Sequence, residues 1–522
     1  MSRSNPGEIG RSITAGSDFL QLSTAGVPVG GLSTWLADQL RAAIADGRLP
    51  LGTRLPASRV LAADLQVSRG VVTEAYQRLT EDGHTTANGR AGTTVVAVPI
   101  STTPPSRARS LAAAHLFSGD AAPSRPAAGG TRARLPQPDV DVFDALRSAP
   151  SRMDLTPGVP DLTAFPRAAW LKAERAVLDR LSASSFGYGD PAGTPELRLA
   201  VARWLARYRG VQVDPAEVII VAGVAQALSL ITQLLIADGI HELAVEDPGS
   251  LGSRQHLQNL GLRTPPVPVD ADGVRVDELH RSGARAVLLT PAHQFPTGVV
   301  LDGERRRELI QWATETGGLI VEDDYDAEHR YDRPPVPALR AMLADHVIYA
   351  GSVSKLLAPA LRIGWMVPPP AYRDRLIAAK RLADLGNAAL PQLVLAHLME
   401  SGDLERQLRY ARRRHRRRRD AMIDAISNHL PTATTHGAAA GLHLTITFPT
   451  DSVDDVDLAT RALAEGIKTH PLSWHTQTPH PPGLVLGYAA RTPTAITEAV
   501  ATIAAVLHRT SASTSSPARP GA

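Results

Sequence analysis

Residues 99–150 constrain the fold of this chain more than any other segment, because they cannot contribute to a folded core. They consist largely of Pro, Ala, Ser, Gly and Arg, a composition with too few apolar side chains to bury, so we interpret them as a basic linker. The chain of 522 residues is therefore expected to fold as two units, one on each side of this linker. Its ends, residues 1–27 and 509–522, are rich in small residues and predict disordered tails.

The composition excludes several kinds of site. The sequence has no cysteine, which excludes disulfides, thiolate metal sites and a thiol nucleophile. The histidines lack metal-binding spacing, so no metal site is predicted; His475 and His480, in a proline-rich loop, are expected to face solvent. The sequence contains no run of about 18 apolar residues and no secretion signal. We therefore expect a soluble, cytoplasmic protein without membrane contact.

Residues 28–98 have the pattern of three short helices followed by a β-hairpin. This arrangement is typical of a winged helix-turn-helix, in which the third helix enters the major groove of DNA. A solvated docking domain with surface arginines is the alternative, because small helical units are common. Apolar periodicity and capping residues place helices at 32–44, 58–65 and 69–79, with Ser58 and Ser68 as the N-caps of the second and third, and the hairpin at 84–98.

Two segments of this unit resemble the DNA-binding domains of GntR-type regulators. One is the run GRLPLGTRLPASRVLA at 47–62, and the other is VSR at 67–69 followed by AY at 75–76. Where family members often have Ser-Thr after the recognition arginine, this chain has Gly-Val at 70–71, so its preferred DNA sequence is expected to be its own. The resemblance implies that DNA is contacted by Arg54, Arg59, Ser68, Arg69 and Thr73, with Gly89 and Arg90 of the wing near the minor groove.

After the linker, residues 151–508 alternate apolar, strand-like segments with helical stretches. This alternation is typical of an α/β architecture, a largely parallel sheet covered by helices on both faces. The carboxyl ends of such strands meet at one edge of the sheet, where α/β proteins bind ligands. The strand-like segments are Val218–Val221, Leu243–Val245, Ala286–Leu289, Leu319–Val321 and Val347–Tyr349.

Lys355 has the most specific chemical context in this unit. It is one of only four lysines, and it follows the strand predicted at 347–349 after a run of small residues. Lysine amines form Schiff bases with carbonyl cofactors, and the nearby Ser352 and Arg362 suit a phosphate through a hydrogen bond and a bidentate fork. A surface lysine is the commoner explanation, so this interpretation depends on partners from other strands.

Two other strand ends supply candidate partners. The strand at 319–321 ends in acidic residues, of which Asp323 suits the protonated ring nitrogen of a pyridoxal cofactor, and Tyr325 suits its ring oxygen. Alternatively, this acidic cluster is merely solvated or binds Mg²⁺. The strand at 218–221 turns through Gly223 into a helix whose free N–H groups form an anion site, although a single glycine turn is weak support.

In this order, these segments resemble the fold-type-I pyridoxal-phosphate enzymes of the aspartate aminotransferase class. The resemblance implies that fold and pyridoxal 5'-phosphate as cofactor. The run FGYGDPAG at 186–193 is similar to a segment whose tyrosine reaches the phosphate in the partner subunit, which implies a homodimer with Tyr188 in that role. The other implied roles are Lys355 as the Schiff-base and catalytic lysine, Asp323 as the pyridinium partner, Tyr325 as the phenolate contact, and Ser352, Arg362 and the amides of Val224 and Ala225 as the phosphate cup.

A GntR-type reader joined by a long linker to an aminotransferase-like domain resembles the MocR group of bacterial regulators. The run PAHQFPTG at 291–298 is in that group's style. The resemblance implies a regulator that binds a double-stranded DNA operator and a small-molecule effector, either pyridoxal phosphate itself or its adduct with an amine. It also implies a domain-swapped dimer that exchanges its reader domains head to tail.

Three positions depart from the pattern of working aminotransferases. Phe295 stands where the enzymes have an asparagine that contacts ring oxygen and substrate, with His293 or Gln294 as candidate replacements. Val485 stands where they have an arginine that grips the substrate carboxylate, a loss worth about 2–5 kcal/mol of binding, and Ser250 stands where they have an aromatic ring. The missing arginine makes the chain look more like a PdxR-type member, which responds to pyridoxal phosphate and controls vitamin B6 synthesis, than like a GabR-type member, which binds an amino acid.

Three functional hypotheses remain. The favoured one is a transcription regulator whose aminotransferase-like domain senses a ligand without turning it over. The second is an active aminotransferase with an accessory DNA-binding domain, and the third is a DNA-binding protein whose large domain is inactive. The arginine-rich run at 412–419 is interpreted as a solvated or acid-paired helix and not as a DNA-binding stripe.

Overall fold

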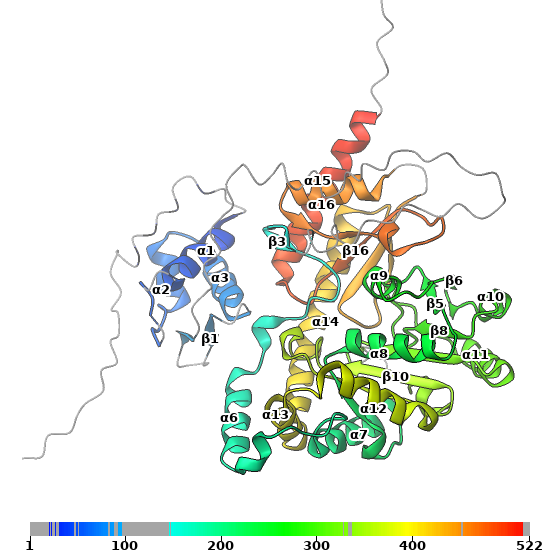
Figure 1. The fold of residues 1–522 in the computed structure, drawn as a ribbon. Coiled ribbons are helices and arrows are strands. Elements are labelled where there is room, and N and C mark those ends of the chain that lie inside the picture. The colour runs from blue at the N-terminus through cyan, green and yellow to red at the C-terminus, as the bar shows by residue number, and fades with distance from the viewer. Residues whose placement is uncertain are drawn as a thin grey trace, which may run out of the picture. The chain divides into compact units, whose positions relative to one another are not determined.

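The structure is a computed structural model, in which contacts divide the chain into two units, Met1–Ser106 and Arg107–Ala522. Each unit is described by itself (Figure 1). Most of the expected linker and tails, at 99–150, 1–27 and 509–522, fall outside the described residues. The structure describes residues 31–45, 48–50, 52–81, 84–87, 92–96, 148–326, 328–331, 337–449 and 453–514, together with residues 20, 22, 24, 27 and 146.

The first unit contains the three helices and the hairpin that the sequence predicts. They are α1 (Leu32–Ala45), α2 (Ser58–Asp64), α3 (Arg69–Glu81), β1 (Thr85–Ala87) and β2 (Thr93–Val95). The helices share one core, because Leu40 of α1, Leu61 of α2 and Val72 of α3 are almost fully buried in the same cluster. The two strands pair antiparallel, with Thr86 opposite Thr94. The winged helix-turn-helix arrangement is therefore confirmed.

The two predicted helix caps of this unit have different outcomes. The Oγ of Ser68 accepts a hydrogen bond from the N–H of Val71 at 3.4 Å, which confirms Ser68 as the N-cap of α3. The prediction for Ser58 is wrong by one residue, because Ala57 occupies the N-cap of α2 and makes no side-chain capping bond. Ser58 is instead the first helical residue.

A mostly parallel sheet forms the centre of the large unit. Its eight strands lie in the order β4 (Ile219–Val221), β11 (Gly364–Val367), β10 (Val347–Ser352), β9 (Leu319–Asp324), β8 (Ala286–Leu289), β5 (Ala244–Asp247), β6 (Pro266–Asp270) and β7 (Gly273–Val274). Neighbouring strands from β10 to β6 run parallel, while β11 and β7 are antiparallel to their neighbours. The largely parallel sheet is thus confirmed, whereas β6, β7 and β11 were not among the strands that the sequence analysis named.

Helices cover both faces of this sheet, as predicted. Successive residues of a strand point to opposite faces: Ile348 packs in the cluster of α8 (Val224–Ala237), and Tyr349 packs in the cluster of α7 (Pro195–Arg209). No helix within the described residues has both the length and the apolar character that a membrane crossing requires. The other helices around this sheet are α6 (Arg167–Leu178), α9 (Leu251–Asn259), α10 (Val276–Ser282), α11 (Gly303–Thr316), α12 (Pro370–Asp384) and α13 (Ala389–Glu400).

A second, antiparallel sheet follows along the chain, and the sequence analysis did not predict it. Its strand order is β12 (Thr434–His436), β13 (His443–Thr447), β16 (Gly483–Gly487) and β15 (His470–Pro471). Its apolar residues share a core with α14 (Asp403–His429), α15 (Asp455–Ala464) and α16 (Pro493–Thr514). A short parallel pair, β3 (Met153–Asp154) with β14 (Ile467–Lys468), connects the start of the unit to this region. The strands β3, β14 and β15 have two residues each, too few to leave a periodic pattern in the sequence.

The boundaries of the large unit differ from those expected. Helix α16 continues to Thr514, so its last turns lie in the segment that was expected to be a tail. Leu146, inside the expected linker, is buried with Leu251 and Trp474. The folded unit therefore extends a few residues beyond 151–508 at both ends.

The arginine-rich run of α14 lies largely against the protein. Arg414 and Arg418 each pair with Asp161 at 2.9 Å, and the Nε of Arg412 donates to the carbonyl of Glu328 at 2.6 Å. His415, in the middle of the run, is buried. The interpretation as an acid-paired helix is confirmed for Arg414 and Arg418.

Candidate functional site

A cavity of about 420 Å³ lies where the parallel strands of the large sheet end. Because strands β4, β9 and β10 all end there, residues more than 100 positions apart in the sequence line one space. Tyr188 is the one predicted cofactor residue that does not line it. The predicted residues that the cavity brings together are Lys355, Asp323, Tyr325, Ser352, Arg362, Val224 and Ala225.

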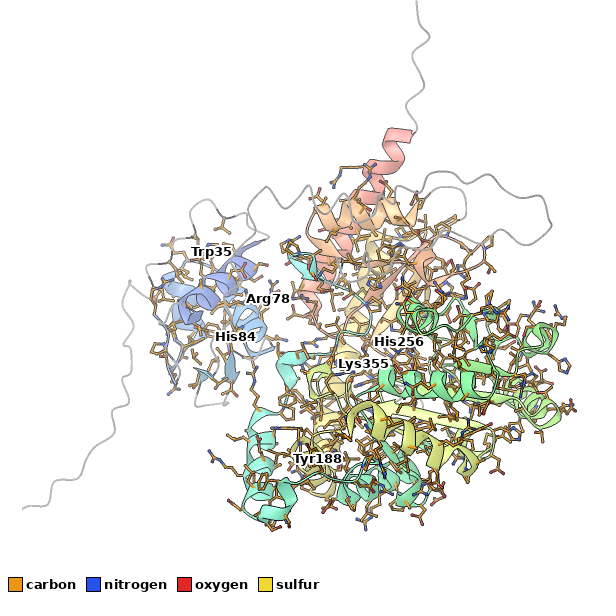
Figure 2. The ribbon with its side chains drawn as sticks, viewed as in Figure 1. Trp35, Arg78, His84, Tyr188, His256 and Lys355 are labelled. Carbon is orange, nitrogen blue, oxygen red and sulfur yellow. The ribbon has the colours of Figure 1, made fainter. Side chains whose placement is uncertain are left out.

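Lys355, which is labelled in Figure 2, lines this cavity. Its Nζ donates a hydrogen bond to the carbonyl of Gly158 at 2.6 Å. Gly158 has a φ of +75°, and a Cβ built there would lie 3.0 Å from Nζ, so a larger residue would crowd the amine. Lys355 follows β10 directly, in the position where a parallel sheet presents reactive groups.

Asp323 lies near the end of β9 with one carboxylate oxygen lacking a partner. Its Oδ1 is buried and has no hydrogen-bond partner among the described residues. Burial first, and then the charge of Asp324, raise the pKa of Asp323 to about 7, while Lys355 opposes this rise. A buried carboxylate that lacks a donor suits a protonated pyridine nitrogen, so this residue fits pyridoxal phosphate.

Replacing Asp323 with asparagine is expected to stabilise the ligand-free protein while weakening its response to pyridoxal phosphate. The folded carboxyl keeps its proton up to about pH 7, whereas the unfolded one loses it near pH 4, so stability falls as the pH rises through this window. Asparagine carries no charge and avoids this loss.

Thermal unfolding with and without pyridoxal phosphate measures both effects of Asp323→Asn. The variant is expected to melt above wild type at about pH 8, with the difference shrinking toward about pH 5. The cofactor is expected to raise the melting temperature of wild type more than that of the variant. Equal cofactor-induced shifts in both proteins would show that Asp323 does not face the cofactor.

The opposite end of the cavity has the features of a phosphate site. Helix α8 begins after Gly223, and its first N–H groups, at Val224 and Ala225, have no acceptor within the helix. The guanidinium of Arg362 donates to the carbonyl of Ala222, and a Cβ on Gly223 would lie 3.1 Å from Arg362 Nη2. This close approach of backbone and guanidinium fits a phosphate group.

The side chain of Tyr188 does not line this cavity. It is 95% exposed in the single chain (Figure 2). A large aromatic side chain this exposed is consistent with a contact to a second subunit, so the dimer role of Tyr188 stays a prediction.

His293 and Gln294, the two candidates for the role of the asparagine that Phe295 replaces, have different surroundings. Phe295 lines the cavity, but Gln294 is buried and its Nε2 donates to the carbonyls of Pro248 and Phe295 at 2.8 and 2.7 Å. The amide of Gln294 is therefore committed to the backbone. The Nδ1 of His293 lies 2.9 Å from the hydroxyl of Tyr325, so His293 is linked to the site through that tyrosine.

The position that the sequence analysis matched to the substrate-gripping arginine holds an apolar side chain, Val485. Val485 is buried within β16, and the Nε of Arg491 donates to the carbonyl of Asp154 at 3.3 Å. Among the described residues, Arg362 is the one arginine that lines the cavity. Apart from Arg362, the described lining thus offers the amine of Lys355, rings and hydroxyls, and no second guanidinium for a substrate carboxylate.

The expectation for His475 is wrong, whereas His480 is exposed as expected. His475 is only 2% exposed and lines the cavity. Its Nδ1 lies 3.3 Å from the carbonyl of Gly249, and its ring meets that of Phe295 edge-on with centroids 5.1 Å apart. Next to it, the Oγ of Ser250 caps α9 by accepting the N–H of Ser253.

The imidazole of His475, at the end of η10 (Leu472–His475), therefore lies beside Ser250, which stands where the enzymes have an aromatic ring. His470 also lines the cavity and stacks on His475 with centroids 5.6 Å apart. The sequence analysis missed both histidines, because His470 lies on the unpredicted strand β15, His475 lies on η10 directly after it, and both are more than 200 residues from Ser250. No local motif marks them.

A buried group of possible metal ligands lies beside the cavity. Donor atoms of His293, Asp326 and His443 lie within 4.8 Å of one another. His443 Nε2, however, lies 3.1 Å from the carbonyl of Pro296, and His293 Nδ1 faces the carboxylate of Asp326 at 3.0 Å. Because these atoms already have partners, we interpret the group as a hydrogen-bonded cluster.

The predicted DNA-binding residues of the first unit are largely exposed. Arg59, Arg69 and Thr73 are solvent-exposed on α2 and α3. Arg54 forms a bridge to Thr94 of β2, which ties the segment before α2 to the hairpin. Of the remaining predicted residues, Ser68 is the cap of α3, and Gly89 and Arg90 lie outside the described residues.

Comparison with known families matches both units. Residues 151–503 match the model for aminotransferase class I and II, and residues 32–95 match the model for bacterial regulatory proteins of the gntR family. The chain is 32% identical to the probable rhizopine catabolism regulatory protein MocR of Rhizobium meliloti, over 89% of this chain and 91% of that protein.

Two further similarities differ in how much of the chain they cover. The chain is 31% identical to the pyridoxine biosynthesis regulator PdxR of Corynebacterium glutamicum, over 79% of this chain and 82% of that protein. The crystal structure of a multiple substrate aminotransferase from Thermococcus profundus matches with a TM-score of 0.65 at 27% identity, covering 72% of this chain and 96% of that one. The full-length similarities are thus to regulators, and the enzyme similarity is confined to the large unit.

Proposed function

This chain belongs to the MocR-type transcriptional regulators, in which a gntR-family DNA-binding domain precedes an aminotransferase-like domain, and we propose that it senses pyridoxal phosphate through Lys355. In this proposal the cofactor binds in the large unit, and its binding, or that of its adduct with an amine, changes how the winged helix-turn-helix binds an operator. The proposed site of action is the cytoplasm, and the proposed assembly is a homodimer.

The observation that carries this proposal is the convergence of groups around one cavity. Lys355 supplies the amine, Asp323 supplies a buried carboxylate, and Arg362 with the start of α8 supplies an anion site. When bound, pyridoxal phosphate supplies an aldehyde for the lysine and a ring that accepts electrons. Lys355 would bind its aldehyde, Asp323 would face its ring nitrogen, and Arg362 with the start of α8 would hold its phosphate.

Sensing is favoured over turnover by what faces the substrate side of the cavity. An amino-acid substrate needs a cation for its carboxylate, and Arg362 at the phosphate end is the lining arginine among the described residues. Phe295 provides no hydrogen bond in place of the asparagine. The proposed effector is therefore pyridoxal phosphate itself, which agrees with the similarity to a regulator of pyridoxine biosynthesis. An active aminotransferase is the second candidate.

DNA binding is expected to depend on Arg69. Footprinting of the full-length protein on DNA flanking its own coding region identifies the operator. Replacing Arg69 with alanine is then expected to weaken operator binding about 5- to 150-fold, the loss expected for one arginine contact. Arg41→Ala is a matched control, because Arg41 lies on α1 and pairs with Asp38. Equal operator affinity of wild type and Arg69→Ala would refute the role of α3 as the recognition helix.

A further inference from the structure

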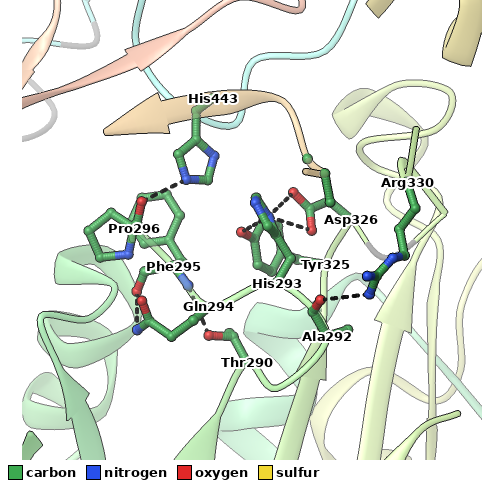
Figure 3. Close-up of polar contacts among 12 residues, drawn as sticks. Thr290, Ala292, His293, Gln294, Phe295, Pro296, Tyr325, Asp326, Arg330 and His443 are labelled. Atoms are coloured by element: carbon green, nitrogen blue, oxygen red, sulfur yellow. Dashed lines mark hydrogen bonds and ion pairs between the residues drawn. The ribbon is translucent and has the colours of Figure 1, made fainter. Parts of the chain in front are cut away.

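The buried side chain of His293 contacts both Tyr325 and the buried carboxylate of Asp326 (Figure 3). The Nδ1 of His293 lies 2.9 Å from the hydroxyl of Tyr325 and 3.0 and 3.2 Å from the two carboxylate oxygens of Asp326. His293 and Asp326 are each about 1% exposed, whereas Tyr325 reaches the cavity. The three side chains thus form a chain of contacts that runs from the interior to the cavity.

Two glycines fix the position of the imidazole. A Cβ on Gly441 would lie 2.0 Å from His293 Cε1 and 2.8 Å from Asp326 Oδ2, and a Cβ on Gly298 would lie 3.1 Å from His293 Nε2. Both glycines have positive φ values, +83° and +72°. The ring is therefore packed against backbone on two sides and cannot swing away from Tyr325.

These contacts determine where the proton of His293 lies. A carboxylate only accepts hydrogen bonds, so Nδ1 at 3.0 Å from Asp326 must carry the hydrogen. His293 Nε2 is buried and has no partner among the described residues, so a hydrogen there would be a donor without an acceptor. With the hydrogen on Nδ1, the phenol oxygen of Tyr325 can accept it. The O–H of Tyr325 has the carboxylate of Asp326 as its acceptor within the protein, and it would turn to the ring oxygen when the cofactor enters the cavity that Tyr325 lines.

Resting on the proposed function, we propose that His293 and Asp326 are positioning residues that aim the O–H of Tyr325 at the ring oxygen of pyridoxal phosphate. Burial keeps the pKa of Tyr325 well above 10, so the phenol stays protonated. The hydrogen bond from Tyr325 thereby compensates for the side chain of Phe295, which cannot donate to that oxygen. Besides Asp326, the acids that raise the pKa of Tyr325 are Asp323 and Glu246, and His443 lies against His293.

The test is a double-mutant cycle read by the absorbance of the bound cofactor. Full-length wild type, His293→Leu, Tyr325→Phe and the double variant are loaded with pyridoxal phosphate, and the visible absorbance band is followed against pH. A donor on the ring oxygen stabilises negative charge there, so its loss disfavours the deprotonated chromophore. We expect His293→Leu to raise the midpoint of the transition by about one pH unit, a tenfold change in the proton equilibrium.

The cycle separates positioning from a merely structural role. His293→Leu is expected to cause no further shift in the Tyr325→Phe background, because the histidine acts through the phenol. His293→Asn, whose amide can donate near the position of Nδ1, is expected to keep the wild-type midpoint. An unchanged midpoint in His293→Leu would overturn this inference, and so would an equal shift with and without the phenol. Either result would leave the proposed function standing.

Two other outcomes are also informative. A wild-type protein without a visible band would overturn the proposed function, and this inference with it. If adding Zn²⁺ to wild type moved the midpoint, and His443→Ala abolished that effect, the cluster of His293, Asp326 and His443 would be a metal site and the hydrogen-bond assignment would be wrong.

Discussion

Replacing Lys355 with alanine is expected to abolish the visible absorbance that pyridoxal phosphate develops on binding to this protein. That absorbance requires covalent attachment of the cofactor to an amine. Within the described part of the chain, Lys355 is the lysine that lines the cavity and reaches Gly158 there. The loss is expected to be complete, because the remaining contacts to phosphate and ring cannot form this bond.

Lys172 provides the matched control for this prediction. It lies exposed on α6 and does not line the cavity, so Lys172→Ala is expected to keep the absorbance of wild type. A dialysed sample reloaded with the cofactor gives the comparison at equal protein concentration. Undiminished absorbance in Lys355→Ala would show that another amine binds the cofactor.

The largest expected loss of stability comes from breaking the buried ion pair between Arg209 and Asp324, the last residue of β9. The Nε of Arg209 contacts Asp324 Oδ2 at 2.5 Å, and both side chains are at most 2% exposed. Arg209→Met leaves the carboxylate of Asp324 buried without its cation, while the hydroxyl of Tyr349 still donates to it. The free energy of unfolding is expected to fall by about 3–5 kcal/mol.

Urea unfolding of the full-length variants measures this effect. Replacing both partners, in Arg209→Met combined with Asp324→Leu, is expected to recover most of the loss, because no unpaired charge then remains buried. A single variant as stable as wild type would contradict the importance of the pair. A double variant less stable than the single one would show that packing, and not charge, sets the cost.

The large sheet and its site could be predicted because both depend on short-range patterns. Strand β8 was predicted with its observed bounds, since both faces of a buried strand need apolar residues and such runs are visible in the sequence. The topology of parallel strands then brings their carboxyl ends to one edge. Lys355, Asp323 and Gly223 therefore meet although they come from three separate segments.

The parts that the sequence did not reveal depend on long-range packing. His475 reaches the cavity because the antiparallel sheet places η10 (Leu472–His475) against the backbone at Gly249. The position of His293 depends on the backbone of Gly441, which lies more than 140 residues away along the chain. Neither arrangement leaves a local period or spacing, so the sequence favoured a solvent-facing loop for His475.

The account depends most on a link between the cofactor and DNA binding. The direct measurement is the dissociation constant of the footprinted operator, determined by fluorescence anisotropy at fixed salt, with and without saturating pyridoxal phosphate. The account predicts a change of about 5- to 150-fold for wild type, the range of typical coupling energies, and none for Lys355→Ala. Identical operator affinities of wild type with and without the cofactor, or a response to free amino acids but not to pyridoxal phosphate, would contradict it.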